Sequence, residues 1–185
     1  MRKIFAGVTT ACVLLAGVMS VSAAAPASFA GTWALDKAKS EGLPPNAAAL
    51  ESLTLTVTQD AQQLTVDSKA TMGSQGEAAG GPGQGRGRGM GLYPQNSSYK
   101  LDGTETTADN PGGRGGTTTS KATWKDGGKT LELKRVSKFS FQGNDVTVTT
   151  TEDWTLSADG KTLTIKRTSE SPRGTQSSTL VFNKQ

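Results

Sequence analysis

The 185-residue chain contains no histidine and a single cysteine, Cys12. Without histidine it cannot form a Ser-His-Asp triad or a metal site with imidazole ligands. Cys12 lies in an apolar N-terminal run that we expect to be removed, so the mature chain would lack a thiol for a disulfide, a nucleophile or a zinc site. We therefore predict no catalytic residues, no metal site, no cofactor and no enzymatic activity.

Apolar side chains are also scarce, since hydrophobic residues make up 34% of the chain and aromatic residues 5%. A core built from so few residues must be lean and lined on one face only. The net charge of +4 falls to about +2 once Arg2 and Lys3 are removed with the N-terminal segment. This balance does not provide the concentrated basic face that nucleic acid requires, so we expect no nucleic-acid partner.

Residues 1–25 have the three parts of a secretory signal peptide. Met1–Lys3 is basic, Ile4–Val21 is dominated by apolar and small residues, and small residues follow at Ala23 and Ala25, after either of which cleavage is expected. A transmembrane anchor is the alternative, but glycine, threonine and serine interrupt the run. We predict an exported protein, periplasmic or extracellular, with no membrane span after cleavage.

The rest of the chain alternates apolar with polar residues, as in Leu53-Thr-Leu55-Thr-Val57, which is typical of half-buried antiparallel strands. Turn signals such as Asp159-Gly160 separate these segments. A short helix is expected after Pro45, with Asn46 as its N-cap. Strands are predicted near residues 31–36, 52–58, 64–70, 97–102, 117–125, 129–141, 146–157, 161–170 and 175–183.

Consecutive hairpins without crossover helices favour an all-β, antiparallel meander. Strands of this number, about eight to ten, manage their edges best by closing into a barrel. We predict one such barrel domain over residues 26–185, with a two-sheet β-sandwich as the alternative fold.

Residues 73–91 do not fit the strand pattern, because they are rich in glycine and nearly free of apolar side chains. Such a segment cannot bury enough surface to become ordered, so we expect a disordered Gly/Arg-rich loop. The alternative, a nucleic-acid segment at Arg86-Gly-Arg88-Gly, is disfavoured because no aromatic residue is interleaved.

A two-residue turn fixes which residues of a hairpin face each other, so the cross-strand register can be predicted by counting outward from each turn. The turns used are Gly127-Gly128, Gly143-Asn144, Asp159-Gly160 and Pro172-Arg173. One predicted row is Trp124, Leu131, Leu156, Leu163 and Phe182, and the next is Ala122, Leu133, Trp154, Ile165 and Leu180. Both rows are apolar throughout, which identifies this face as the core.

The next predicted row on the same face is polar: Ser120, Arg135, Glu152, Arg167 and Ser178. In this register Glu152 lies directly between the two arginines. One interpretation is an open barrel end where the arginines reach water. The other is a ligand site, because two guanidiniums against one carboxylate leave a positive charge that could bind an anionic head group. Apolar parts of that ligand would lie among aromatic residues such as Trp154.

Phe29-Ala-Gly31-Thr-Trp33 resembles the F-x-G-x-W opening of the calycins, the superfamily of lipocalins and fatty-acid-binding proteins. The chain looks most like small exported bacterial lipocalin-like proteins of unassigned function. The resemblance implies an antiparallel barrel with an apolar ligand inside and Trp33 at the closed end, covered by an arginine from a late strand. With Trp33, we expect Trp124 and Phe182 to form the barrel floor. The Arg-x-Tyr clamp of fatty-acid-binding proteins is replaced by Leu180-Val-Phe182, so that head-group site is not carried over.

We therefore predict a monomeric, non-enzymatic binding protein for a lipid-like, apolar or anionic amphipathic small molecule. The alternative is a structural or surface-interaction protein of the cell envelope whose barrel is filled by its own side chains. The first function requires free interior volume beside Arg135 and Trp154, and the second requires none.

Overall fold

The computed structural model describes residues 25–73, 96–110 and 115–185. The expected signal peptide, residues 1–25, lies outside these ranges except for Ala25. The expected Gly/Arg-rich loop, residues 73–91, lies outside them except for Gly73.

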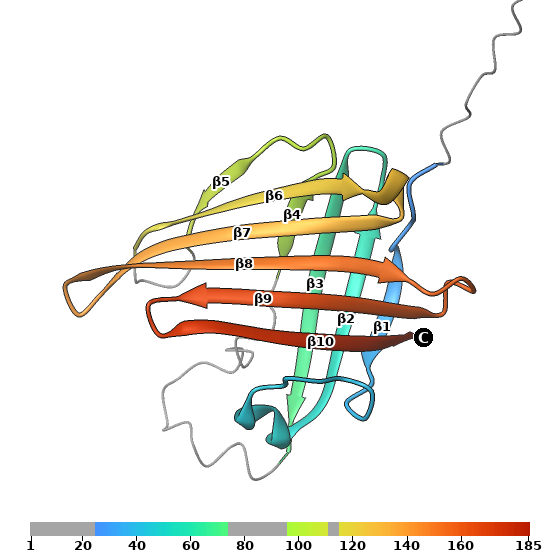
Figure 1. Ribbon diagram of the computed structural model, residues 1–185, viewed down its shortest axis with the longest axis horizontal. Helices are drawn as coiled ribbons and strands as arrows, with labels where there is room; N and C mark the ends of the chain where they lie inside the picture. Colours follow the sequence, from blue (N-terminus) through green and yellow to red (C-terminus); the bar gives the residue numbers. More distant parts are fainter. Residues whose placement is uncertain (1–24, 74–95, 111–114) are drawn as a thin grey trace, which may run out of the picture.

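The described chain forms one antiparallel sheet of ten strands in the order β4-β3-β2-β1-β10-β9-β8-β7-β6-β5. The strands are β1 (Gly31–Leu35), β2 (Leu50–Gln59), β3 (Gln63–Met72), β4 (Ser97–Lys100), β5 (Thr106–Asp109), β6 (Thr117–Lys125), β7 (Thr130–Phe141), β8 (Asn144–Leu156), β9 (Thr162–Ser171) and β10 (Gly174–Lys184). In Figure 1, β6 to β10 cross in front of β1 to β4, and β4 lies against β6. The sheet therefore curls into a nearly closed barrel, which confirms the predicted all-β, lipocalin-like architecture. The sandwich alternative is wrong because hydrogen bonds join all the strands into one sheet.

The strand predictions are accurate to within about two residues at each end, the usual uncertainty of strand boundaries. The prediction omitted β5, because its sequence Thr-Thr-Ala-Asp shows no apolar alternation. The predicted helix is a 3₁₀ helix, η1 (Pro45–Ala49), which begins at Pro45. Asn46 therefore lies inside the helix and is not its N-cap, so that detail of the prediction is wrong.

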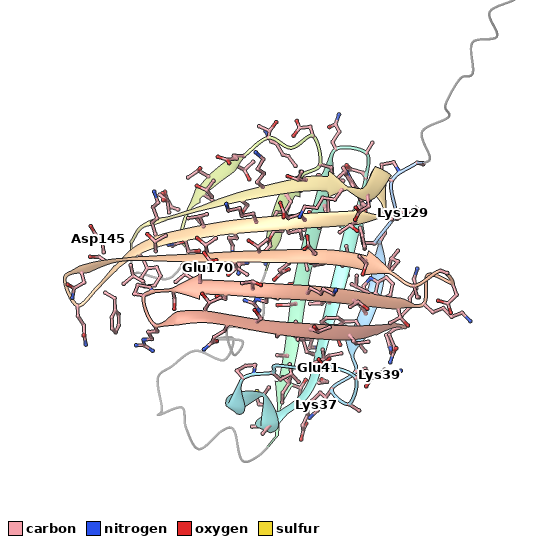
Figure 2. The ribbon with its side chains drawn as sticks, viewed as in Figure 1. Lys37, Lys39, Glu41, Lys129, Asp145 and Glu170 are labelled. Carbon is pink, nitrogen blue, oxygen red and sulfur yellow. The ribbon has the colours of Figure 1, made fainter. Side chains whose placement is uncertain are left out.

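Polar and charged side chains cover the outside of the barrel. Figure 2 labels Lys129, Asp145 and Glu170 among them, and all three are exposed. The inside of the sheet is apolar at one end, where Trp33, Trp154, Phe29 and Phe182 have no accessible surface. The core is thus lined on one face of the sheet, as the composition predicts.

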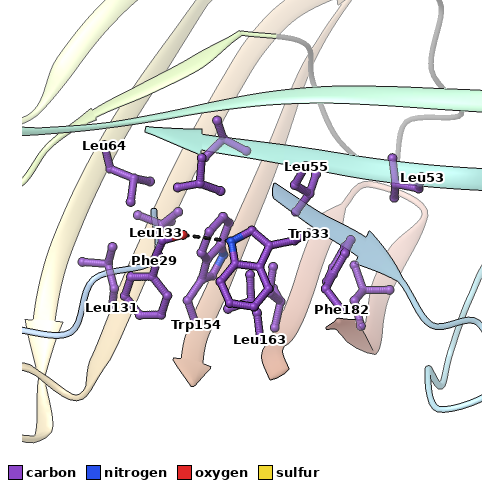
Figure 3. Packing of buried hydrophobic residues seen from close by; sticks show 14 of the residues in the cluster. Phe29, Trp33, Leu53, Leu55, Leu64, Leu131, Leu133, Trp154, Leu163 and Phe182 are labelled. Atoms are coloured by element: carbon purple, nitrogen blue, oxygen red, sulfur yellow. Dashed lines mark hydrogen bonds between the residues drawn. The ribbon is translucent and has the colours of Figure 1, made fainter. Parts of the chain in front are cut away.

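The floor of the barrel is built around the segment that leads into β1 (Figure 3). Phe29 stacks on Trp124 with ring centroids 6.1 Å apart and meets Trp154 edge-on at 5.8 Å. Its carbonyl accepts a 2.9 Å hydrogen bond from the Trp33 indole Nε1. The side chain of Gln59 accepts from the backbone of Phe29 at 2.8 Å and donates to the Ala27 carbonyl at 3.1 Å. The lead-in segment thereby closes the narrow end of the barrel.

Trp33 and Phe182 lie in this floor as predicted, and Trp124 packs at its edge, partly buried. The resemblance implied an arginine over Trp33. Here the cation is a lysine from the last strand, because the Lys184 ammonium lies 5.3 Å from the centroid of the Trp33 ring. This distance is within the range of a cation–π contact.

The predicted register holds at three interfaces and fails at one. Trp124 faces Leu131, Leu156 faces Leu163, and Phe182 also faces Leu163, as predicted. Between β7 and β8, however, Leu131 faces Trp154 and not Leu156. The register of this hairpin is therefore two residues away from the prediction.

The cause of the error is the turn between β7 and β8. Phe141 pairs with Asn144, so the turn residues are Gln142 and Gly143, with φ angles of 52° and 80°. A two-residue turn of this kind needs positive φ at both central positions and favours glycine at the second. Gly143 takes that second position, whereas the prediction placed it first. A two-residue shift leaves the same side chains facing inward, so the apolar pattern alone could not reveal it.

The two turns can be distinguished by valine substitutions. Because a β-branched side chain is strained at positive φ, Gln142→Val is expected to lower the free energy of unfolding by about 1 kcal/mol or more. Asn144→Val, at an extended strand position, should change it by less than about 0.5 kcal/mol. Urea unfolding of both variants measures the difference. A larger loss for Asn144→Val would favour the turn at Gly143-Asn144.

Candidate functional site

The inner face of the barrel changes from apolar to polar along the strands. From β6 to β10 the rows are Trp124, Leu131, Trp154, Ile165 and Leu180; then Ala122, Leu133, Glu152, Arg167 and Ser178; then Ser120, Arg135, Thr150, Ser169 and Gln176. Ser120 faces Arg135 and Ser178 faces Arg167, as predicted. The predicted polar residues therefore share one face, but they occupy two adjacent rows, which we call the polar layer.

Glu152 is the most buried charged residue of the polar layer, with 4% of its surface exposed. Its Oε1 lies 3.6 Å from Nε of Arg167, directly opposite on β9. Its Oε2 accepts a 3.0 Å hydrogen bond from the Trp154 indole Nε1. A buried carboxylate is strongly destabilising unless it is paired and hydrogen-bonded, and these two contacts meet that requirement.

Arg135 was predicted to share a row with Glu152, but it lies in the next row, further along β7. It faces Thr150 on β8 and Ser120 on β6, so the prediction that Glu152 lies directly between two arginines is wrong. The two-residue shift of β8 is the reason. Within the described chain no carboxylate lies within ion-pair distance of the Arg135 guanidinium, whereas Arg167 has Glu152.

Tyr99 brings a phenol to Arg135 from β4, the strand that lies against β6 at the opening of the sheet. Tyr99 pairs with Leu64 on β3 and is 4% exposed. The pKa of Tyr99 is raised to about 12, mainly by burial and in addition by the negative charge of Glu152. The positive charge of Arg135 and hydrogen bonds with Ser97 and Arg135 lower it in part. At neutral pH Tyr99 is therefore a protonated donor beside a guanidinium.

The sequence prediction did not include Tyr99, Thr150 or Ser68, which are 4%, 5% and 7% exposed. Thr150 could have been found from the correct β7–β8 turn, because it faces Arg135. Tyr99 could not be placed by counting from a turn, since the connection from β3 to β4 is too long to fix which residues of the two strands face each other. Ser68 lies on the inner face of β3 opposite Leu55, and a lone serine in an alternating strand gives no signal of its own.

Free volume lies further along the inner face than the position beside Trp154 where a binding function was expected to require it. Trp154 has no accessible surface, so no solvent-sized space adjoins its side chain. A hollow of about 360 Å³ lies beyond the polar layer. It is lined by Phe139, Phe141, Val146, Val148, Ser171, Pro172 and Arg173. The floor is thus filled by side chains, and the accessible part of the inner face is its polar and outer end.

Over residues 25–73, 96–110 and 115–185, no group of three or more acidic side chains is arranged to hold a metal ion. No helix in these ranges is long and apolar enough to cross a membrane.

No protein-family model and no curated protein matches the chain. Solved structures with a similar fold include a REP1-NXSQ fatty acid transporter, at 11% identity and a TM-score of 0.48 over 84% of this chain and 95% of that one. Another is zebrafish ileal bile acid-binding protein in complex with cholic acid, at 15% identity and a TM-score of 0.46 over 85% of this chain and 98% of that one. A third is apo lipid binding protein 8 of Caenorhabditis elegans, at 13% identity and a TM-score of 0.49 over 91% of this chain and 100% of that one. At this similarity the function has to be argued from the chain's own residues.

The raised pKa of Tyr99 predicts how stability changes in alkali. Because the folded protein holds this proton more tightly than the usual pKa of 10.0 implies, the stabilisation is complete below pH 10 and is lost as the pH rises towards about 12. In Tyr99→Phe this loss should disappear. Urea unfolding at several pH values between these limits, with tyrosinate absorbance followed in parallel, measures it. Parallel stability curves for the two proteins would show that Tyr99 is not buried as described.

Proposed function

We propose that this chain is an exported, non-enzymatic protein that binds an anionic amphipathic small molecule at the polar layer of its barrel. The observation that carries the proposal is the position of Arg135. It is a half-buried cation on the inner face, and no described carboxylate pairs with it, in contrast to Arg167. Burying part of a charge is unfavourable unless a partner compensates it, and an anionic ligand would be that partner.

The chemistry around Arg135 suits a carboxylate. The guanidinium offers several N–H donors in one plane, and the Tyr99 hydroxyl beside it keeps its proton at neutral pH. A carboxylate could accept from both groups, and charge-assisted bonds of this kind are the stronger ones. Ser120 and Thr150 supply further hydroxyls next to the arginine. Glu152 and Arg167 compensate each other nearby and leave the net charge of the layer positive.

Export is proposed from the basic, apolar and small-residue segments of residues 1–25. A role without catalysis is supported by the absence of histidine from the whole chain and of cysteine after Cys12. The polar layer accordingly contains arginine, glutamate, hydroxyl and phenol groups, which suit recognition of a polar head group.

A filled barrel without a ligand is the second candidate, and the closed floor favours it. Trp33, Trp154 and Phe29 occupy the narrow end completely. Native mass spectrometry of the mature protein from its exporting host separates the two functions. A bound compound of defined mass, released on denaturation, supports the binding protein. A clean apo mass that does not shift with added fatty acids, isoprenoids or quinones supports the filled barrel.

Palmitate binding by isothermal titration calorimetry tests the role of Arg135 directly. Arg135→Gln is expected to weaken binding at least tenfold, because a hydrogen bond to a charged group contributes about 1.5–3 kcal/mol. Lys134→Gln is the matched control, since it removes the same charge from the exposed, outer face of the same strand. Equal affinities for the wild type and Arg135→Gln would exclude Arg135 from the head-group site.

A further inference from the structure

The hollow beyond the polar layer lies on the same inner face as Arg135. Along β7 the inward residues after Arg135 are Ser137, Phe139 and Phe141, and their partners on β8 are Val148, Val146 and Asn144. Pro172 and Arg173, in the turn between β9 and β10, form the other side. Figure 1 shows this end of the β7–β8 hairpin projecting beyond the rest of the barrel. We call this hollow and its apolar lining the outer groove.

The outer groove is apolar where a hairpin end is normally polar. Phe139, Val146 and Val148 are only partly buried, and Phe141 is 39% exposed, the one large hydrophobic side chain in the described chain with such exposure. None of the four belongs to the buried core or packs against it. Apolar surface gathered around an open hollow is unfavourable in water and typically marks a binding surface.

The charges near the outer groove favour an uncharged group in it. Among the described residues there, Lys138 and Arg173 are cationic, and Asp145 and Glu170 are anionic, so the two signs balance. Figure 2 shows Asp145 at the hairpin end. A surface that docks on an anionic membrane would carry an excess of basic side chains around its apolar residues, which the described residues of this region lack.

The spacing connects the groove to the head-group site. Val148 lies two residues beyond Thr150, the partner of Arg135, and Phe141 lies six residues beyond Arg135 on β7. Six residues of extended strand span about 20 Å, at roughly 3.3 Å per residue. The apolar lining therefore starts next to the polar layer and continues outward for the length of a long acyl chain.

We infer that the outer groove holds the apolar tail of the ligand whose anionic head binds Arg135, so the ligand is a long-chain anionic amphiphile. The inference rests on the proposed function, because it needs the head group at Arg135. The filled floor sets the orientation: with no solvent-sized space beside Trp154, the tail extends outward over β7 and β8.

Fatty acids of different length test the tail site. The wild type should bind palmitate more tightly than octanoate, because only palmitate reaches Phe141. Replacing both Phe141 and Val146 by serine should weaken palmitate binding about tenfold and leave octanoate binding unchanged, since the lost contacts are apolar. Val136→Ser is the control, because Val136 is an apolar residue of the same strand that faces outward. Circular dichroism spectra establish that each variant is folded.

The outcomes separate the tail site from the proposed function. If Arg135→Gln weakens binding of both acids while the double serine variant binds palmitate like the wild type, the tail site is wrong and the head-group site stands. If neither acid binds the wild type, the proposed function and the tail site both fail. A third outcome is that the double variant keeps its palmitate affinity but no longer binds phosphatidylcholine or phosphatidylglycerol vesicles, which would assign the groove to a membrane. If the double variant instead keeps its palmitate affinity but no longer dimerises, the groove would be assigned to a second copy of the chain.

Discussion

The interior of this barrel depends on the need to compensate one buried carboxylate. Glu152 is almost inaccessible, and its two oxygens are used by groups from different layers: Arg167 in the polar layer and the Trp154 indole in the floor. Since a buried charge without partners destabilises the fold by several kcal/mol, the loss of either contact would lower the free energy of unfolding. Trp154 in turn packs against Phe29, which closes the narrow end. The carboxylate thus fixes the height at which the apolar floor ends and the polar layer begins.

The same layer also spans the opening in the sheet. The strand order ends at β4 and β5, and no backbone pairing joins these two edges among the described residues, although β4 lies against β6. At this opening Tyr99 of β4 meets Arg135 of β7. Buried polar contacts of this kind are strong when fully satisfied, because the surrounding dielectric is low. Side chains of the polar layer therefore hold the barrel together where the hydrogen-bond ladder does not, and this ties the candidate head-group site to the closure of the fold.

The sequence was sufficient to predict nine of the ten described strands, the inward face and the chemistry of the polar layer, because alternation with a period of two determines all three. It was not sufficient for the register of β7 and β8. The pattern of inward residues is unchanged by a two-residue shift, so only the φ angles of Gln142 and Gly143 decide between the two registers. Tyr99 was missed for a related reason: its approach to Arg135 depends on how far the sheet curls, which no local pattern encodes. The polar layer could thus be predicted in composition, but its contacts could not.

The order of layers along the inner face is what distinguishes the two candidate functions. A barrel filled by its own side chains accounts for the floor, where Trp33 and Trp154 have no accessible surface. It does not account for an apolar lining that begins again beyond Arg135, at Val148, and continues to an exposed Phe141. A chain without function there would be expected to place polar residues at a solvated hairpin end, because exposed apolar surface is unfavourable. An amphiphile with its head at the polar layer and its tail along β7 and β8 accounts both for Arg135, which pairs with no described carboxylate, and for the apolar residues beyond it.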